Sequence, residues 1–175
     1  MSSPKSPPPV VEVIPSLEAA LTEVAEQSFC GFVEPCTPDR FGELLDVARE
    51  SGGAWLRAHL GFKGPFQGEL TVDLPEPLAK SLLASCFGLD ANDDSQFSAV
   101  VVEDGAGELA NMICGTWLTR SYGNARFDLK PPRVERLAQQ AFTVQNVTVA
   151  PPDTGVLLTG INDLPVRVGL SVQEG

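Results

Sequence analysis

The chain has 175 residues, of which 43% are apolar, enough for one domain with a hydrophobic core. Its 23 acidic and 12 basic side chains give a net charge of -11, which repels nucleic-acid phosphates and anionic membranes. No apolar run is long enough to cross a membrane, and the N-terminal M-S-S-P-K-S-P-P-P lacks the apolar segment of a secretory signal. These features predict a cytoplasmic protein with no nucleic-acid or membrane partner.

The cysteine and histidine content argues against several enzyme classes. The four cysteines form no C-x-x-C pair and His59 is the single histidine, so a zinc site is hard to assemble. We expect the cysteines to be reduced, buried thiols. A Ser-His-Asp or Cys-His hydrolase would have to use His59, which alternates with apolar neighbours in a predicted strand and is expected to be structural.

Four helices are predicted after a flexible Pro/Ser-rich tail over residues 1–12. Each has an apolar face and is bounded by capping or helix-breaking residues. They cover about residues 16–29, 39–50, 75–87 and 96–122. Ser16 is the expected N-cap of the first helix, and Gly88 and Gly123 are expected to end the third and fourth.

Strands are predicted on both sides of the last two helices. Residues 54–62 and 66–74 flank K-G-P-F, whose glycine and proline favour a hairpin turn. The later strands are predicted at residues 125–129, 141–149, 155–161 and 165–172, with turns at 151–153 and 162–163. Consecutive strands with short turns favour antiparallel pairing. We therefore predict one α+β domain over residues 13–175, an antiparallel sheet with long helices packed on one face.

The longest predicted helix carries a line of polar or small residues. At 3.6 residues per turn these positions form one stripe about 16 Å long. They are Asp104, Glu108, Asn111 and Gly115. A solvent-exposed face is one interpretation, but such a face usually has long charged side chains. In addition, the glycines of this predicted helix (105, 107 and 115) each cost about 1 kcal/mol of helix stability relative to alanine. The other interpretation is a docking or active surface that another molecule approaches closely.

The stripe resembles D-x-x-x-E-x-x-N, the signature of the CheC/CheX/FliY chemotaxis phosphatases, at Asp104, Glu108 and Asn111. E-L-A-N-M-I-C-G is similar to the family's E-L-x-N-x-x-x-G core. In L-K-P-P-R-V, Pro132 is the candidate for the family's downstream proline, and Pro131 is the competing choice. The hairpin F-K-G-P-F-Q-G-E-L-T-V-D-L and the helix P-L-A-K-S-L-L also resemble the family.

This resemblance covers about residues 16–173 and contains one complete motif. CheC-type members carry the motif on two helices. Here the first helix has Thr22 and Glu26 in register but Phe29 where the asparagine is required. A chain with a single complete motif resembles CheX rather than CheC. Because CheX-like proteins are typically dimers, the resemblance also implies a homodimer.

The resemblance implies an activity and a partner. The chain would remove phosphate from the aspartyl-phosphate of a CheY-like response-regulator receiver domain. Asn111 would orient the attacking water, since an amide both accepts and donates hydrogen bonds, and Glu108 would pair with the receiver's active-site lysine. Asp104, Gly115 and Pro132 would support docking. The receiver would supply Mg²⁺, so the chain would need no metal or cofactor of its own.

Two alternatives remain open. A domain with this fold could bind a response regulator, or a second copy of itself, without catalysing any reaction. The intact Glu108 and Asn111 pair favours the enzyme over this binding domain. An unrelated ligand-binding α+β domain would require a sizeable pocket between the sheet and the helices, and no residue of the sequence indicates one.

Overall fold

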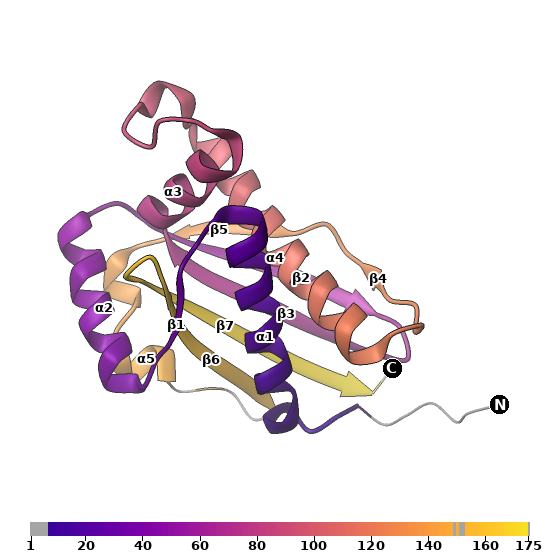
Figure 1. The fold of residues 1–175 in the computed structure, drawn as a ribbon. Coiled ribbons are helices and arrows are strands. Elements are labelled where there is room, and N and C mark those ends of the chain that lie inside the picture. The colour runs from indigo at the N-terminus through magenta and orange to yellow at the C-terminus, as the bar shows by residue number, and fades with distance from the viewer. Residues whose placement is uncertain (1–6, 149, 151–152, 175) are drawn as a thin grey trace.

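The computed structural model describes residues 7–148, 150 and 153–174. The strands in this part of the chain form one antiparallel sheet (Figure 1). The strand order is β1-β6-β7-β3-β2-β4, and β5 also pairs with β2. The strands are β1 (Val33–Pro35), β2 (Trp55–Lys63), β3 (Phe66–Pro75), β4 (Asp128–Leu129), β5 (Arg133–Leu137), β6 (Thr154–Ile161) and β7 (Leu164–Glu174). The predicted hairpins are confirmed: β3 follows β2 across the K-G-P-F turn, and β7 follows β6 across Asn162 and Asp163.

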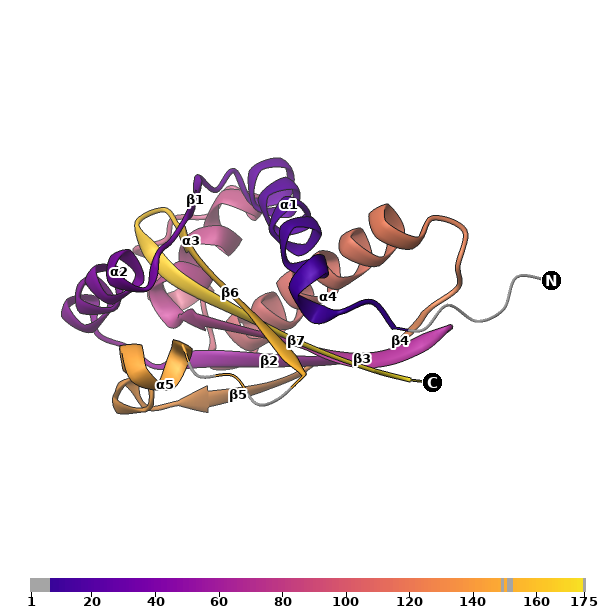
Figure 2. The same ribbon diagram turned by 90° about the horizontal axis from the view of Figure 1, so that it is seen from below.

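Three helices cover one face of the sheet (Figure 2). They are α1 (Val10–Phe29), α3 (Glu76–Phe87) and α4 (Ala99–Tyr122). Alternate residues of the central strands point into the core beneath them, for example Leu56, Ala58 and Leu60 on β2 and Leu70, Val72 and Leu74 on β3. The predicted α+β class is confirmed. Contacts with α1, α3 and β5 fix the orientation of α4. No helix among the described residues is long and apolar enough to span a membrane.

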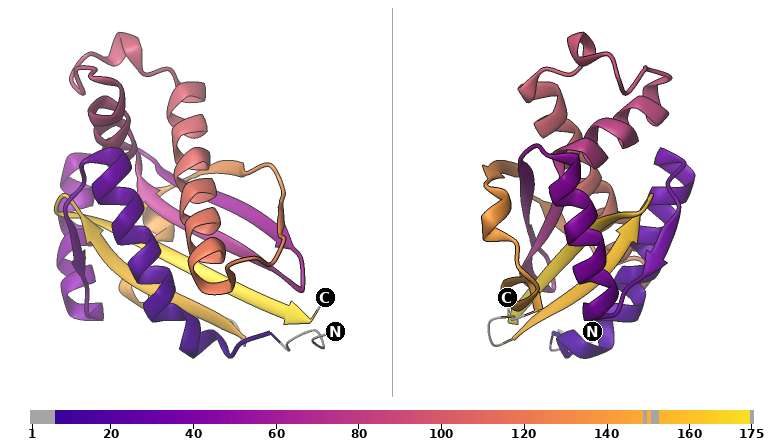
Figure 3. Two further views of the ribbon diagram at one scale, coloured as in Figure 1. Left: turned by 45° about the vertical axis from the view of Figure 1, so that its right-hand side comes forward. Right: turned by 90° about the vertical axis from the view of Figure 1, so that its left-hand side faces the viewer.

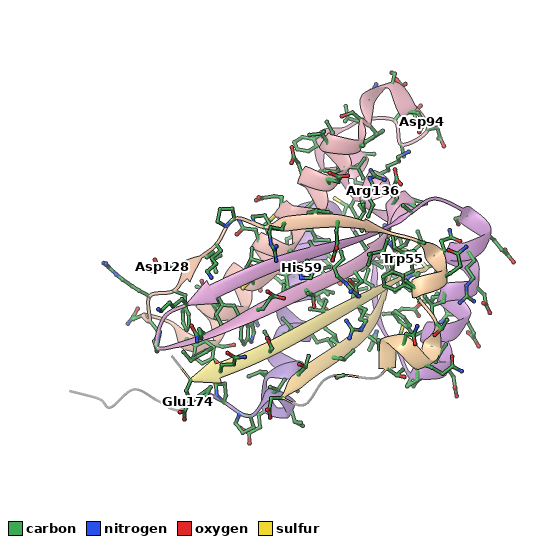
Figure 4. The ribbon with its side chains drawn as sticks, turned by 180° about the vertical axis from the view of Figure 1, so that it is seen from behind. Trp55, His59, Asp94, Asp128, Arg136 and Glu174 are labelled. Atoms are coloured by element: carbon green, nitrogen blue, oxygen red, sulfur yellow. The ribbon has the colours of Figure 1, made fainter. Side chains whose placement is uncertain are left out.

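The opposite face of the sheet is covered by helices at one end. There α2 (Pro38–Ser51) and α5 (Val144–Thr148) lie beside a second apolar cluster centred on Trp55. The Trp55 indole stacks on the ring of Phe142, with 4.1 Å between the ring centroids. Beyond this end the face is polar, and His59 lies in its middle with its ring nitrogens 3.3 Å from Glu69 and 2.8 Å from Glu135 (Figure 4). These contacts are consistent with the expected structural role of His59.

The predicted strand at residues 141–149 is wrong. Gln139–Ala141 form a 3-10 helix, η2, and Val144–Thr148 form α5, while residue 149 lies outside the described residues. The alternating pattern indicated a strand, but Phe142 packs on Trp55 instead of joining the sheet. The Thr143 hydroxyl also accepts a hydrogen bond from the Asn146 N–H at the start of α5. Tertiary packing and a local cap therefore override the two-residue period.

The first helix begins at Val10 rather than at Ser16. Ser16 lies inside α1, where its hydroxyl donates to the Val13 carbonyl and accepts from the Trp117 indole N–H. The helix extends upstream because Val10 and Ile14 pack over Gly155 of β6, where a Cβ would lie 2.3 Å from Val10 Cγ1. The tail expected over residues 1–12 thus overlaps this helix, and its residues 1–6 lie outside the described residues.

The cysteines are unpaired, but the expectation that they are buried is wrong for two of them. Cys114 is buried in α4, and burial raises the pKa of its thiol to about 12. Cys36 is half-buried, and burial raises its pKa to about 11. Cys30 and Cys86 are exposed because they lie at the C-terminal ends of α1 and α3, beyond the apolar faces of these helices.

Candidate functional site

The candidate site lies on α4, the longest helix of the described chain. The Ser98 hydroxyl caps its start by accepting a hydrogen bond from the Val101 N–H, and Gly123, at a φ of 54°, ends it. One face of α4 is buried in the core. Its buried side chains include Val102, Ala106, Leu109, Ile113 and Trp117. These anchors turn the polar stripe outward.

The four stripe residues lie together on the outer side of α4. Asp104 and Glu108 are exposed, and Asn111 and Gly115 are partly exposed. Within the part of the chain that the structure describes, no hydrogen bond or ion pair engages the side chains of Asp104, Glu108 or Asn111. Two carboxylates and an amide are therefore available to another molecule, as a docking or active surface requires.

Two acidic residues close to the stripe are paired, in contrast to Asp104 and Glu108. Glu103 precedes Asp104 but faces β5, where it accepts a 2.7 Å hydrogen bond from Arg136. The same guanidinium donates a 2.8 Å bond to Glu76 of α3. Figure 4 shows Arg136 on β5, close to α3 and α4. The protein pairs the acids on the flank of α4 and leaves those on its outer ridge unpaired.

The glycines of α4 have two different explanations. A Cβ on Gly105 would lie 2.6 Å from the Leu83 side chain of α3, and one on Gly107 would lie 3.1 Å from Pro132 Cγ. These two glycines permit close packing within the chain. A Cβ on Gly115 would meet no atom closer than Leu129 Cδ1 at 3.9 Å, so its surroundings are open. The idea that the glycines admit another molecule applies to Gly115 alone.

Replacing Gly115 with alanine tests this assignment. We expect Gly115→Ala to raise the free energy of unfolding by about 1 kcal/mol, since alanine favours a helix interior and the added methyl group has room. Urea unfolding followed by circular dichroism measures the change. A loss of stability would mean that the position is packed within the chain like Gly105.

Pro132 flanks the stripe on the β5 side. Its ring lies over Gly107, one helical turn before Asn111, which is consistent with the choice of Pro132 as the downstream proline. The segment before β5 thus borders the ridge on one side, and Pro132 itself is exposed. Pro132 and the stripe therefore border the same surface.

An apolar hollow of about 530 Å³ borders the other side of the stripe. It lies between α4 and the C-terminal ends of α1 and α3. Its apolar lining includes Phe29, Leu83, Phe87, Val101 and Met112, and Asp104 and Glu108 also line it. This hollow was not predicted from the sequence, although Val101 and Met112 lie next to the stripe at helical spacing. It is formed between helices, not between sheet and helices.

The first helix provides no second site. Phe29, which stands in place of the asparagine, is only 4% exposed and belongs to the core, while Thr22 is partly exposed and Glu26 exposed. His59 also takes no part in the ridge, because odd-numbered residues of β2 face away from α4. Among the described residues, no cluster of three His, Cys, Asp or Glu side chains is placed to hold a metal ion.

The fold is that of the CheC, CheX and FliY group of chemotaxis proteins. The chemotaxis protein CheX from Vibrio vulnificus superposes with a TM-score of 0.66 at 16% identity, covering 93% of this chain and 97% of that one. The CheX–CheY–BeF3–Mg²⁺ complex from Borrelia burgdorferi gives 0.59 at 15% identity, with 93% and 98% covered. FliY from Thermotoga maritima gives 0.54 at 13% identity, with 98% and 92% covered.

The sequence itself identifies the family. Residues 57–150, more than half of the chain, match the family described as "Chemotaxis phosphatase CheX", and this range contains the whole stripe and Pro132. The chain belongs to the CheX family, as its motif indicated. No curated protein matches the chain.

Proposed function

We propose that this protein hydrolyses the aspartyl-phosphate of a CheY-like receiver domain. The observation that carries the proposal is the pair Glu108 and Asn111, held one turn apart on an open ridge with no partner within the described chain. Family membership and the CheX–CheY complex from Borrelia burgdorferi support a receiver as the partner. An aspartyl-phosphate is an acyl phosphate, so the bond to be broken is already labile.

Asn111 is the residue to which we assign the catalytic role. Its side-chain carbonyl accepts a hydrogen bond from a water proton and its NH2 group donates, so it can hold a water in line with the phosphorus. The water oxygen forms the new bond to phosphorus as the bond to the aspartyl oxygen breaks. The products are inorganic phosphate and the aspartate carboxylate. Orientation of this kind supplies several kcal/mol without a nucleophile from the phosphatase.

Glu108 and Asp104 would act in docking. Glu108 is exposed and one helical turn from Asn111, so pairing with the receiver's active-site lysine would fix the register in which the amide enters the receiver. Asp104 lies one further turn away and would widen the contact, with Gly115 and Pro132 at its borders. Mg²⁺ would be held by the receiver's own acidic residues, and this chain would contribute no metal ligand.

The proposal is tested by phosphate loss from receiver domains labelled with acetyl phosphate. We expect the cognate receiver to lose phosphate faster when this protein is added. A protein that binds the phosphorylated receiver and leaves its rate of phosphate loss unchanged would instead be the non-catalytic binding domain.

Glu108→Lys tests the docking role separately. Reversing the charge turns attraction to the receiver lysine into repulsion, and we expect the half-saturating receiver concentration to rise about tenfold with a smaller change in the maximal rate. The effect should shrink at high ionic strength. Glu12→Lys is the matched control, since it makes the same charge change at an exposed position in the first turn of α1. Equal effects of both substitutions would assign the change to net charge alone.

The homodimer implied by the resemblance is also part of the proposal. Sedimentation equilibrium at micromolar concentration is the appropriate measurement. A mass twice that of the 18.6 kDa chain is expected, and a monomer at all concentrations would exclude it.

A further inference from the structure

The hollow beside the stripe has a mainly apolar lining. Four of the large apolar side chains that the described chain exposes lie at the end of α3 and the beginning of α4. They are Phe87 (68% exposed), Leu89 (38%), Val100 (64%) and Val101 (43%). Phe87 and Val101 line the hollow itself, together with Asp104 and Glu108 of the stripe. Exposed apolar groups gathered around a hollow are typical of an interaction surface.

This surface is held in place by the loop that joins α3 to α4, which projects beyond the sheet (Figure 3). Gly88, at a φ of 65°, closes α3 directly after Phe87, and the Leu89 N–H donates to the Ala84 carbonyl as in a Schellman cap. Phe97 is buried and anchors the far end of the loop. Lys80 of α3 forms a 3.1 Å ion pair with Asp94. An ordered apolar surface loses little conformational entropy when a partner covers it.

The charges at the hollow select among possible occupants. In a two-fold contact between copies of this chain at the hollow, the unpaired carboxylates of Asp104 and Glu108 from both copies would meet, and like charges repel. The net charge of -11 adds to this repulsion. A surface that presents an apolar side chain next to a cation suits the hollow better. A receiver whose lysine pairs with Glu108 presents such a cation at the required place.

Resting on the proposed function, we infer that the hollow receives an apolar side chain of the receiver, located beside the lysine that pairs with Glu108. The apolar contact supplies binding energy that does not depend on the phosphate. It therefore distinguishes receivers that carry a large apolar side chain at this place from receivers that carry a polar one. Phe87 and Val101 are specificity-determining residues, whereas Asn111 acts on the reacting water.

Val101→Ser and Val47→Ser form a matched pair for the test. Both valines lie on helices and each is 43% exposed, but Val47 is on α2, at the opposite face of the sheet. For Val101→Ser, and more strongly for Phe87→Ser, we expect the half-saturating concentration of phosphorylated receiver to rise about fivefold to tenfold with an unchanged maximal rate. Val47→Ser should change neither quantity. Unchanged half-saturation in both hollow variants would overturn the inference.

Cys86 provides a second readout, since its exposed thiol also lines the hollow. Saturating receiver, kept in its active form with beryllofluoride, should slow the alkylation of Cys86 by iodoacetamide and leave the slow labelling of Cys36 unchanged. An unprotected Cys86 in a saturated complex would contradict the inference. Val101→Ser could instead change the mass measured by sedimentation equilibrium and leave the half-saturating receiver concentration unchanged. In that case a second copy of the chain occupies the hollow and the inference is wrong.

These outcomes are separable from failure of the proposed function. If the unmodified protein accelerates phosphate loss from no receiver domain, the proposed function fails, and the inference that rests on it fails with it. If the protein is active and Asn111→Ala is inactive but the hollow variants behave normally, the proposed function stands and this inference alone is rejected.

Discussion

Asn111→Ala is expected to lower the maximal rate of receiver dephosphorylation by about 100-fold or more, because the attacking water loses the group that orients it. The receiver concentration that gives half of the maximal rate should change little, since Glu108, Asp104 and the hollow remain. The measurement is phosphate release from a labelled receiver at saturating concentration.

The stability of this variant provides an internal control. The Asn111 side chain makes no hydrogen bond within the described chain, and alanine favours a helix, so the free energy of unfolding should stay constant or rise by about 0.5 kcal/mol. Asn124→Ala, at an exposed position just after α4, should keep the full rate. An Asn111→Ala protein that retains half of the normal rate would exclude the water-orienting role.

Asp73→Ala is expected to have the largest effect on stability, a loss of about 3 kcal/mol in the free energy of unfolding. The Asp73 side chain is fully buried and accepts hydrogen bonds of 2.7 and 3.0 Å from Arg57 and one of 3.3 Å from Arg167. Its carboxylate bonds raise the pKa of the Arg57 guanidinium. Without Asp73, two guanidinium groups would remain side by side on the sheet.

Glu69→Ala is the comparison on the same face. Glu69 contacts His59, but its side chain is 49% exposed, and an exposed pair of this kind contributes less than about 1 kcal/mol. Urea unfolding at neutral pH compares the two variants. Equal losses would mean that the Asp73 cluster stabilises no more than a surface ion pair. Asp73 lies on the face of the sheet away from α4, so molecules of either variant that remain folded should keep the Asn111-dependent activity.

The sequence was sufficient for the features that depend on local periodicity. The alternation in β2 and β3 and the turn residues between them define the hairpin, and the helical spacing in α4 places its polar residues on one outward stripe. Phe29, which stands where a second motif would need asparagine, belongs to the core.

The features that were missed depend on contacts between distant segments. β1 and β5 are short, and they exist because β6 and β2 offer them an edge to pair with. α5 replaces a predicted strand because Phe142 packs on Trp55, which lies far away in the sequence. The glycines at 105 and 107 suggested that another molecule approaches the helix there. Instead, Leu83 and Pro132 of the same chain occupy the space beside them. The hollow likewise requires the C-terminal ends of α1 and α3 to meet the first half of α4.

A crystal structure of this protein with its receiver in the beryllofluoride form would test the role of Asn111 most directly. We expect the ridge of α4 to face the receiver's active site, with an Asn111 side-chain atom within about 3.5 Å of a water in line with the beryllium and Glu108 against the lysine. A receiver seated elsewhere on the protein, with Asn111 left in solvent, would contradict the account.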